Sequence, residues 1–164
     1  MPKENAPRQT VWTWQLIKRV LRANRIGKTE EMIRAFHISL HTALRLQEVL
    51  NSTFDPKRRV MALGKSKGVQ AGVRVEIPVT RRAVKVLGNQ FVVGPNEGST
   101  LFSKLCRELL IKDLTFHDAR GTALTLMARR MDVMTLAKIS RHKNLNLLLS
   151  TYFRETAEQI AKRI

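Results

Sequence analysis

The chain has 164 residues, 43% of them hydrophobic, which is enough to bury the core of a single domain. Thirty lysine and arginine residues against thirteen aspartate and glutamate residues give a formal net charge of +17. Such a charge attracts a polyanion, and nucleic acid is the partner that it favours. An anionic membrane surface would also attract it, but the sequence lacks a long apolar run and a lipidation signal, so we expect no membrane partner.

The single cysteine, Cys106, cannot form a disulfide within the chain, which fits a reducing cytoplasm. The first residues also lack the apolar core of a secretory signal. We therefore expect a cytoplasmic protein with one domain over residues 1–164.

The first part of the chain predicts two helices. Apolar residues at helical spacing place one over Gln9 to Ile26, and Thr29 can cap the next. The second helix has a buried stripe at fourfold spacing, formed by Met32, Phe36, Leu40 and Leu44. The segment from Asn51 to Pro56 ends this helix, so Arg45 is expected inside it, just off the stripe.

The remaining chain predicts one hairpin followed by helices. Two extended segments, Arg59 to Leu63 and Val73 to Val79, flank a turn over Gly64 to Gly72 and form a small antiparallel hairpin. A loop is expected over Gly88 to Thr100. The predicted helices are Thr80 to Leu87, Leu101 to Ile111, one capped by Thr115 in a box with Asp118 and continuing past Met127, Met131 to Ile139, and Leu145 to Arg154. The fold class is therefore mainly α (α+β), with a small antiparallel β-sheet.

Four short segments combine cations with one nucleophile: Thr42 to Glu48, His117 to Arg120, His142 to Asn144, and Tyr152 to Arg154. To break a DNA strand without a metal, an enzyme needs a nucleophile for phosphorus, cations on the non-bridging oxygens, and an acid for the departing oxygen. The segments contain groups that could serve these purposes.

Arg45 and Arg120 can grip a phosphate from two sides through forked donors. Glu48 follows Arg45 by three residues and could fix its rotamer, although such a pair is more often a surface salt bridge. His117 lies in the first turn of a helix, where amides and the dipole favour phosphate, or it simply caps a turn. Tyr152 is the only tyrosine and the candidate nucleophile. The structural alternative is an aromatic residue that packs at the edge of the core.

In their order, and in ending on a tyrosine, these segments resemble the catalytic domain of the tyrosine recombinases, the phage integrase family, over roughly Thr29 to Ile160. The resemblance implies that Tyr152 attacks the scissile phosphate to give a 3′-phosphotyrosine link and a free 5′-hydroxyl. The bond energy is kept, so no metal, ATP or other cofactor is implied.

The same resemblance assigns roles to the other residues. Arg45, Arg120 and His142 would hold the phosphate, and His117 would assist proton transfer. A lysine in the turn after the second extended segment would protonate the leaving oxygen. Lys67 fits this role better than Lys65, because the family often places a Ser or Thr immediately before the lysine and a small residue soon after it.

The chain departs from the family pattern at several points. Ala43 and Arg141 stand where the family usually has glycine, and the step from His142 to Tyr152 is ten residues, one longer than usual. Most members also carry a separate amino-terminal domain that clamps DNA. The chain has no room for it, which predicts a catalytic fragment or a minimal protein.

We expect the partner to be duplex DNA in a basic cleft, and the resemblance implies a monomer in solution that forms a tetramer at synapsis. The polar tail, with Ile160 and Ile164 at helical spacing, would dock on a neighbouring protomer. The candidate contacts with the DNA backbone are Lys57, Arg58, Arg59, Arg74, Arg81, Arg82, Arg129, Arg130 and Lys143.

Three alternatives belong to other classes. A helix-turn-helix regulator would use Ala128 to Arg141, with Met131 to Val133 as its turn, and would need no nucleophile. A type IB topoisomerase would share the tyrosine chemistry and religate one strand in place. His37 and His41 have the spacing of zinc ligands, but the glutamate of the HExxH motif is missing, so no metal site is predicted.

Overall fold

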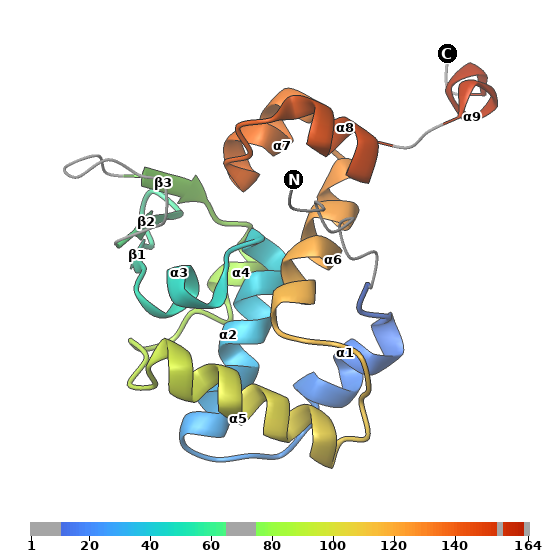
Figure 1. Ribbon diagram of the computed structural model, residues 1–164. Helices are drawn as coiled ribbons and strands as arrows, with labels where there is room; N and C mark the ends of the chain where they lie inside the picture. The colour runs from blue at the N-terminus through green and yellow to red at the C-terminus, as the bar shows by residue number, and fades with distance from the viewer. Residues whose placement is uncertain (1–10, 65–74, 154–155, 163–164) are drawn as a thin grey trace, which may run out of the picture.

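The computed structural model describes residues 11–64, 75–153 and 156–162. One central helix, α2 (Lys28–Thr42), organises the larger part of the molecule (Figure 1). It packs against α1 (Trp14–Leu21), α3 (Leu46–Leu50), α4 (Arg81–Val84), α5 (Pro95–Glu108) and α6 (His117–Ala128). The mainly helical fold class predicted from the sequence is confirmed.

A three-stranded antiparallel sheet lies beside α3. Its strands are β1 (Thr53–Asp55), β2 (Val60–Leu63) and β3 (Val75–Pro78), in the order β1-β2-β3. Met61 pairs with Ile77, and both side chains are buried against the helices. The predicted hairpin is confirmed as β2 and β3. The strand β1 was not predicted, because its segment was assigned only to the end of a helix.

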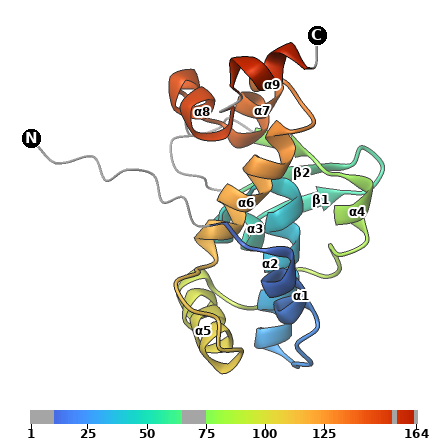
Figure 2. The same ribbon diagram turned by 90° about the vertical axis from the view of Figure 1, so that its right-hand side faces the viewer.

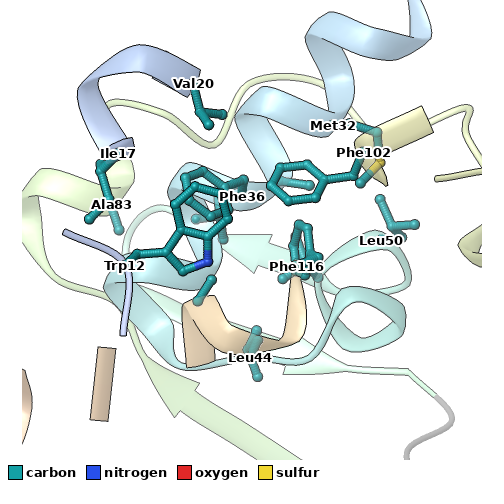
Figure 3. Packing of buried hydrophobic residues seen from close by; sticks show 14 of the residues in the cluster. Trp12, Ile17, Val20, Met32, Phe36, Leu44, Leu50, Ala83, Phe102 and Phe116 are labelled. Atoms are coloured by element: carbon teal, nitrogen blue, oxygen red, sulfur yellow. The ribbon is translucent and has the colours of Figure 1, made fainter. Parts of the chain in front are cut away.

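An aromatic cluster fills the main core (Figure 3). The rings of Trp12 and Phe36 meet edge to face, with centroids 4.7 Å apart, and Phe102 and Phe116 pack edge to face at 5.3 Å. Trp12 lies before α1 and not within a helix that starts at Gln9, so that prediction was wrong for Trp12. Its indole N–H donates to the carbonyl of Thr115 at 3.1 Å, which ties the start of the described chain to the approach to α6.

A second, smaller core joins α6 to the two helices that follow it. In Figure 2, α7 (Val133–Ser140) and α8 (Leu145–Tyr152) lie at one end of α6, far from α5. The buried residues of this core are Ala43, Ala123, Leu124, Leu136 and Leu148. The last helix, α9 (Ala157–Ala161), has no buried residue.

The predicted second helix is interrupted. Ala43 has a positive φ of 58° and ends α2, and Arg45 becomes the N-cap of the separate helix α3. Gly27, and not Thr29, occupies the N-cap position of α2. Arg45 therefore lies at the start of a short helix and not inside a long one.

Two further helix starts differ from the prediction. The segment expected to be a loop is helical from Pro95, since proline is well suited to the first helical position. The N-cap of α6 is Phe116, one residue after Thr115. The carboxylate of Asp118 nevertheless accepts the backbone N–H of Thr115 at 2.7 Å, which is half of the predicted capping box, while the Thr115 hydroxyl donates to the same carboxylate.

Candidate active site

Arg120 lies at the centre of the candidate site. Its side chain projects from α6 and only 5% of the residue is exposed. Nη1 donates to the carbonyl of Ala43 at 2.5 Å, and Nη2 donates to the carbonyl of Ser140 at 2.6 Å. These carbonyls lie at the carboxyl ends of α2 and α7, where helices leave acceptors unsatisfied. One guanidinium group therefore joins two helix ends.

Both helix ends turn in the same way. Ala43 (φ 58°) and Arg141 (φ 57°) are left-handed C-cap residues, a conformation that glycine adopts most easily. Arg45 follows the first turn by two residues, and His142 follows the second directly. Because Arg120 bonds to both turns, it fixes the spacing between the segments that carry Arg45 and His142.

Glu48 joins the same two segments a second time. It is 4% exposed, and its Oε2 accepts the backbone N–H of Arg45 at 3.0 Å. Its Oε1 accepts Arg45 Nη1 at 3.2 Å and also Arg141 Nη2. Burial raises the pKa of Glu48, but the hydrogen bonds from the Arg45 N–H and from Arg141, with the charges of both arginines, together hold it below its ordinary value. Glu48 is therefore a carboxylate at neutral pH.

Arg45 and Arg120 place two guanidinium groups near each other. Burial, followed by the charge of Arg45, lowers the pKa of Arg120 to about 10, so Arg120 is still a cation at neutral pH. The Arg45 side chain is 46% exposed and lies open to solvent. Two cations in proximity repel each other, and a bound anion would relieve that repulsion through charge-assisted hydrogen bonds.

The two predicted histidines lie around this pair of arginines. His117 is the first residue of α6 and keeps much of its surface exposed although its ring is partly desolvated, while His142 is partly buried, with Nδ1 2.8 Å from the hydroxyl oxygen of Ser140. Burial lowers the pKa of each, and the charges of Arg120 and Arg45 lower it further; the opposing effect of Asp118 on His117 is smaller. Both rings are therefore mainly neutral at neutral pH and can accept a proton.

Tyr152 is the last residue of α8 and is partly buried. Burial raises the pKa of its hydroxyl, and the charge of Arg120 only partly opposes this. The hydroxyl is thus protonated at neutral pH and requires a base before it can attack. The step of ten residues from His142 corresponds to a short turn and the eight residues of α8, and it leaves both side chains within the electrostatic influence of Arg120.

The structure therefore brings Arg45, Glu48, His117, Arg120, His142 and Tyr152 together. Lys67, its alternative Lys65, and the candidate contact Arg74 lie outside the described residues. Sequence reasoning gave Arg141 no role and noted it only as a departure from the glycine that is usual in the family. The sequence did contain one signal for Arg141: it is a cation directly before His142, and Glu48 is a carboxylate near Arg45 with which it could pair.

The other candidate contacts are all exposed. They are Lys57, Arg58 and Arg59 between β1 and β2, Arg81 and Arg82 on α4, Arg129 and Arg130 after α6, and Lys143 before α8. Arg58 differs from the rest because it makes two hydrogen bonds to Glu76, at 2.9 and 2.7 Å. Its charge is therefore shared with a carboxylate.

The alternatives gain no support from the geometry. Ser140, in the segment that a helix-turn-helix regulator would expose, is 1% exposed, and its carbonyl is held by Arg120. The rings of His37 and His41 lie 5.1 Å apart, but within the described ranges no group of three or more potential metal ligands is found. No helix in those ranges is long and apolar enough to cross a membrane.

The relatives found by comparison with known proteins carry the names of integrases and recombinases. No family model matches the chain. A protein of Haemophilus influenzae named as an integrase/recombinase is 25% identical over 99% of the chain and 58% of its own length. The shufflon-specific DNA recombinase of Escherichia coli is 30% identical over 69% of the chain and 32% of its own length. The chain thus spans only part of the curated relatives that it matches.

Solved structures with a similar fold cover nearly the whole chain. The Tn1549 transposon integrase in complex with circular intermediate DNA superimposes with a TM-score of 0.73 at 18% identity, over 99% of this chain and 66% of that one. The XerA recombinase superimposes with a TM-score of 0.68 at 15% identity, over 99% and 65% of the two chains. The XerH recombinase bound to its difH substrate gives 0.61 at 14% identity, over 93% and 52%.

Proposed function

Because the chain has the fold of the tyrosine recombinase catalytic domain, we propose that it cuts and rejoins DNA at specific sites through a 3′-phosphotyrosine intermediate. The names of its relatives in sequence support this reaction, and several similar structures were solved with DNA bound. The observation that carries the proposal is the arrangement around Arg120. The charge of Arg120 affects the pKa of His117, His142 and Tyr152, and the charge of Arg45 affects that of both histidines, which supports a shared place for a bound anion.

In the proposed reaction, Tyr152 Oη attacks phosphorus as the bond from phosphorus to the 5′-oxygen breaks. Arg45, Arg120 and His142 bind the non-bridging oxygens, where negative charge grows in the transition state. The phosphotyrosine ester keeps the energy of the broken bond. A 5′-hydroxyl of a second strand can therefore reverse the step and rejoin the DNA.

Two protons must move. The Tyr152 proton needs an acceptor because burial favours the protonated hydroxyl, and the lowered pKa of His117 keeps its ring neutral and able to accept that proton. The leaving 5′-oxygen needs a donor. We propose Lys67 for this role, with Lys65 as the alternative, on the family resemblance alone.

Duplex DNA is the proposed partner, held by the exposed cations on α4, around the sheet and near the ends of α6 and α8. Cutting and joining two duplexes needs several active sites, so we propose a tetramer at synapsis, formed from a monomer in solution. The exposed face of α9, which includes Ile160, is available for docking on a neighbouring protomer. The reaction belongs where bacterial or phage DNA is found, in the cytoplasm.

Covalent capture tests the proposal. The full chain is incubated with a pool of nicked suicide duplexes that carry a randomised segment, boiled in detergent, and the DNA that remains attached is sequenced. We expect adducts on a defined sequence with the unaltered chain and none with Tyr152→Phe, which removes only the attacking oxygen. Strand exchange between two copies of the selected duplex then separates recombination from relaxation in place.

Ser150→Ala is the matched control, because it removes a hydroxyl from an exposed position on the same helix and should leave adduct formation unchanged. Both variants should bind the selected duplex as the unaltered chain does. Adducts with Tyr152→Phe, or none with the unaltered chain across the pool, would refute the proposal.

A further inference from the structure

Arg141 is a cation of the candidate site to which neither the resemblance nor the proposed reaction gives a role. Its guanidinium is bound to the carboxylate of Glu48, and the side chain is only 17% exposed. The contact joins residues 93 positions apart in the sequence, one at the end of α7 and the other in α3. The same carboxylate oxygen accepts Arg45.

The backbone does not explain an arginine at this position. With φ at 57°, the position favours glycine, and any other side chain is strained there. The ion pair with Glu48 is the contact that favours arginine over glycine. A planar guanidinium can donate to a carboxylate in a fixed direction, which a lysine cannot reproduce.

The geometry points to Arg141 as a positioning residue that, acting through Glu48, holds Arg45 in place for the transfer of the phosphate to Tyr152. This inference rests on the proposed function. Arg141 precedes His142, and Arg45 is the N-cap of α3, so the two ion pairs of Glu48 connect the segments that carry two of the proposed phosphate-binding residues.

The charges around Glu48 support this role. Three cations face the carboxylate, namely Arg45, Arg141 and Arg120. Without Arg141, Oε1 of the buried carboxylate would lose one of the two guanidinium groups that donate to it. Arg45 would then be drawn more strongly towards Glu48 and away from the solvent side, where a phosphate would bind. A displacement of about 1 Å can cost on the order of 100-fold in rate.

A double-mutant cycle tests the inference, with Arg141→Met, Glu48→Gln and the double variant. Methionine keeps an unbranched stem and the left-handed strain of a side chain at this position but removes the guanidinium donors. The rate of adduct formation in a single turnover is measured on the nicked duplex that the capture experiment selects, and the unfolding temperature is measured without DNA. We expect Arg141→Met to slow adduct formation by on the order of 100-fold. In the Glu48→Gln background, the same change should alter the rate by less than about twofold.

A pH profile separates positioning from a purely structural contribution. Removing Arg141 takes away one of the interactions that lower the pKa of Glu48, so its acid form should appear at higher pH. The acid limb of the rate profile should therefore move to higher pH in Arg141→Met. Lys138→Met is the matched control, because it removes an exposed charge from α7 and should change neither the rate nor the profile.

Each outcome decides the inference. Additive effects on the rate would mean that Arg141 acts directly on DNA and would overturn it. Coupling in the unfolding temperature with an unchanged rate would also overturn it, because the pair would then be structural only. Absence of adducts with the unaltered chain would refute the proposed function and the positioning role together, whereas adducts with an unaffected Arg141→Met would refute the positioning role alone.

Discussion

Arg120 combines structure and proposed chemistry in one side chain. Its two terminal nitrogens hold the carbonyls of Ala43 and Ser140, and its charge affects the pKa of Tyr152 and of both site histidines. A substitution of this buried arginine would remove a donor from one or both carbonyls. Arg45, by contrast, is exposed and supported from one side by Glu48.

Arg120→Lys should therefore lose both stability and activity. A single ammonium group cannot donate to both carbonyls in the same geometry, and an unsatisfied buried carbonyl costs about 1–3 kcal/mol in the free energy of unfolding. The rate of adduct formation should fall by on the order of 100- to 1000-fold, as for a lost oxyanion donor. Urea unfolding and single-turnover capture measure the two effects.

Arg45→Lys is the comparison for that variant. Because the side chain is 46% exposed, its stability should stay close to that of the unaltered chain while its rate falls. An Arg120→Lys variant as stable as Arg45→Lys would show that the two carbonyl bonds do not matter for folding.

At the scale of elements, helix ends decide where the site residues lie. The buried face of α2 was predicted from apolar spacing: Met32 and Phe36 are buried as expected, and Leu40 is partly buried. Leu44 is buried too, but it lies after the end of α2. The break at Ala43 was not predicted, because alanine favours a helix interior and nothing local favours a left-handed turn there. Long-range contacts stabilise it, above all the bond from Arg120 to the Ala43 carbonyl.

The residues of the candidate site could be predicted from the sequence, but their convergence in space could not. Residue types and their order indicated Arg45, His117, Arg120, His142 and Tyr152, since the chemistry needs those groups. Their convergence depends on bonds such as the one from Arg120 to Ser140, 20 residues apart in sequence, which no local pattern predicts. The contact of Arg141 with Glu48 is of this long-range kind, and the roles of Lys65 and Lys67 stay predictions.

The end of α5 offers a test of left-handed strain away from the site. Leu110 has a φ of 54° and is 80% exposed, so its side chain contributes little burial. Leu110→Gly removes the strain but adds freedom to the unfolded chain, and we expect a net gain of about 0.5 kcal/mol in the free energy of unfolding. Chemical denaturation measures it.

Ile26→Gly is the control for this gain. Ile26 is 87% exposed and is not among the described residues with positive φ, so glycine there should bring no stabilisation. A gain in both variants would mean that losing an exposed apolar side chain, and not relief of strain, accounts for the effect.

At the scale of the whole molecule, histidine protonation should link stability to pH. All four histidines have a lowered pKa in the folded chain, with burial as the leading cause in each. Below the ordinary value of 6.5, the unfolded chain therefore binds more protons than the folded one, and the free energy of unfolding must fall as the pH falls.

We expect urea unfolding without DNA to show a steady loss of stability from pH 7 to pH 5. The lowered pKa values of Glu48 and Asp132 act at lower pH, since their ordinary values are 4.5 and 3.8. The double variant His37→Gln and His41→Gln should show a shallower loss, because it removes two of the four groups. Stability that rises on acidification would contradict this account.

The order of the site residues along the chain has a consequence for protein synthesis. Arg45 and Glu48 emerge from the ribosome early, His117 and Arg120 later, and Tyr152 at the end of α8 comes last of all. Since chains fold as they are made, starting from the amino terminus, the basic surface of α4 and the sheet can meet DNA before the nucleophile exists. Under the proposed function, a nascent or prematurely terminated chain could occupy DNA but could not cut it, so translation itself delays strand cleavage until nearly every other part of the site is in place.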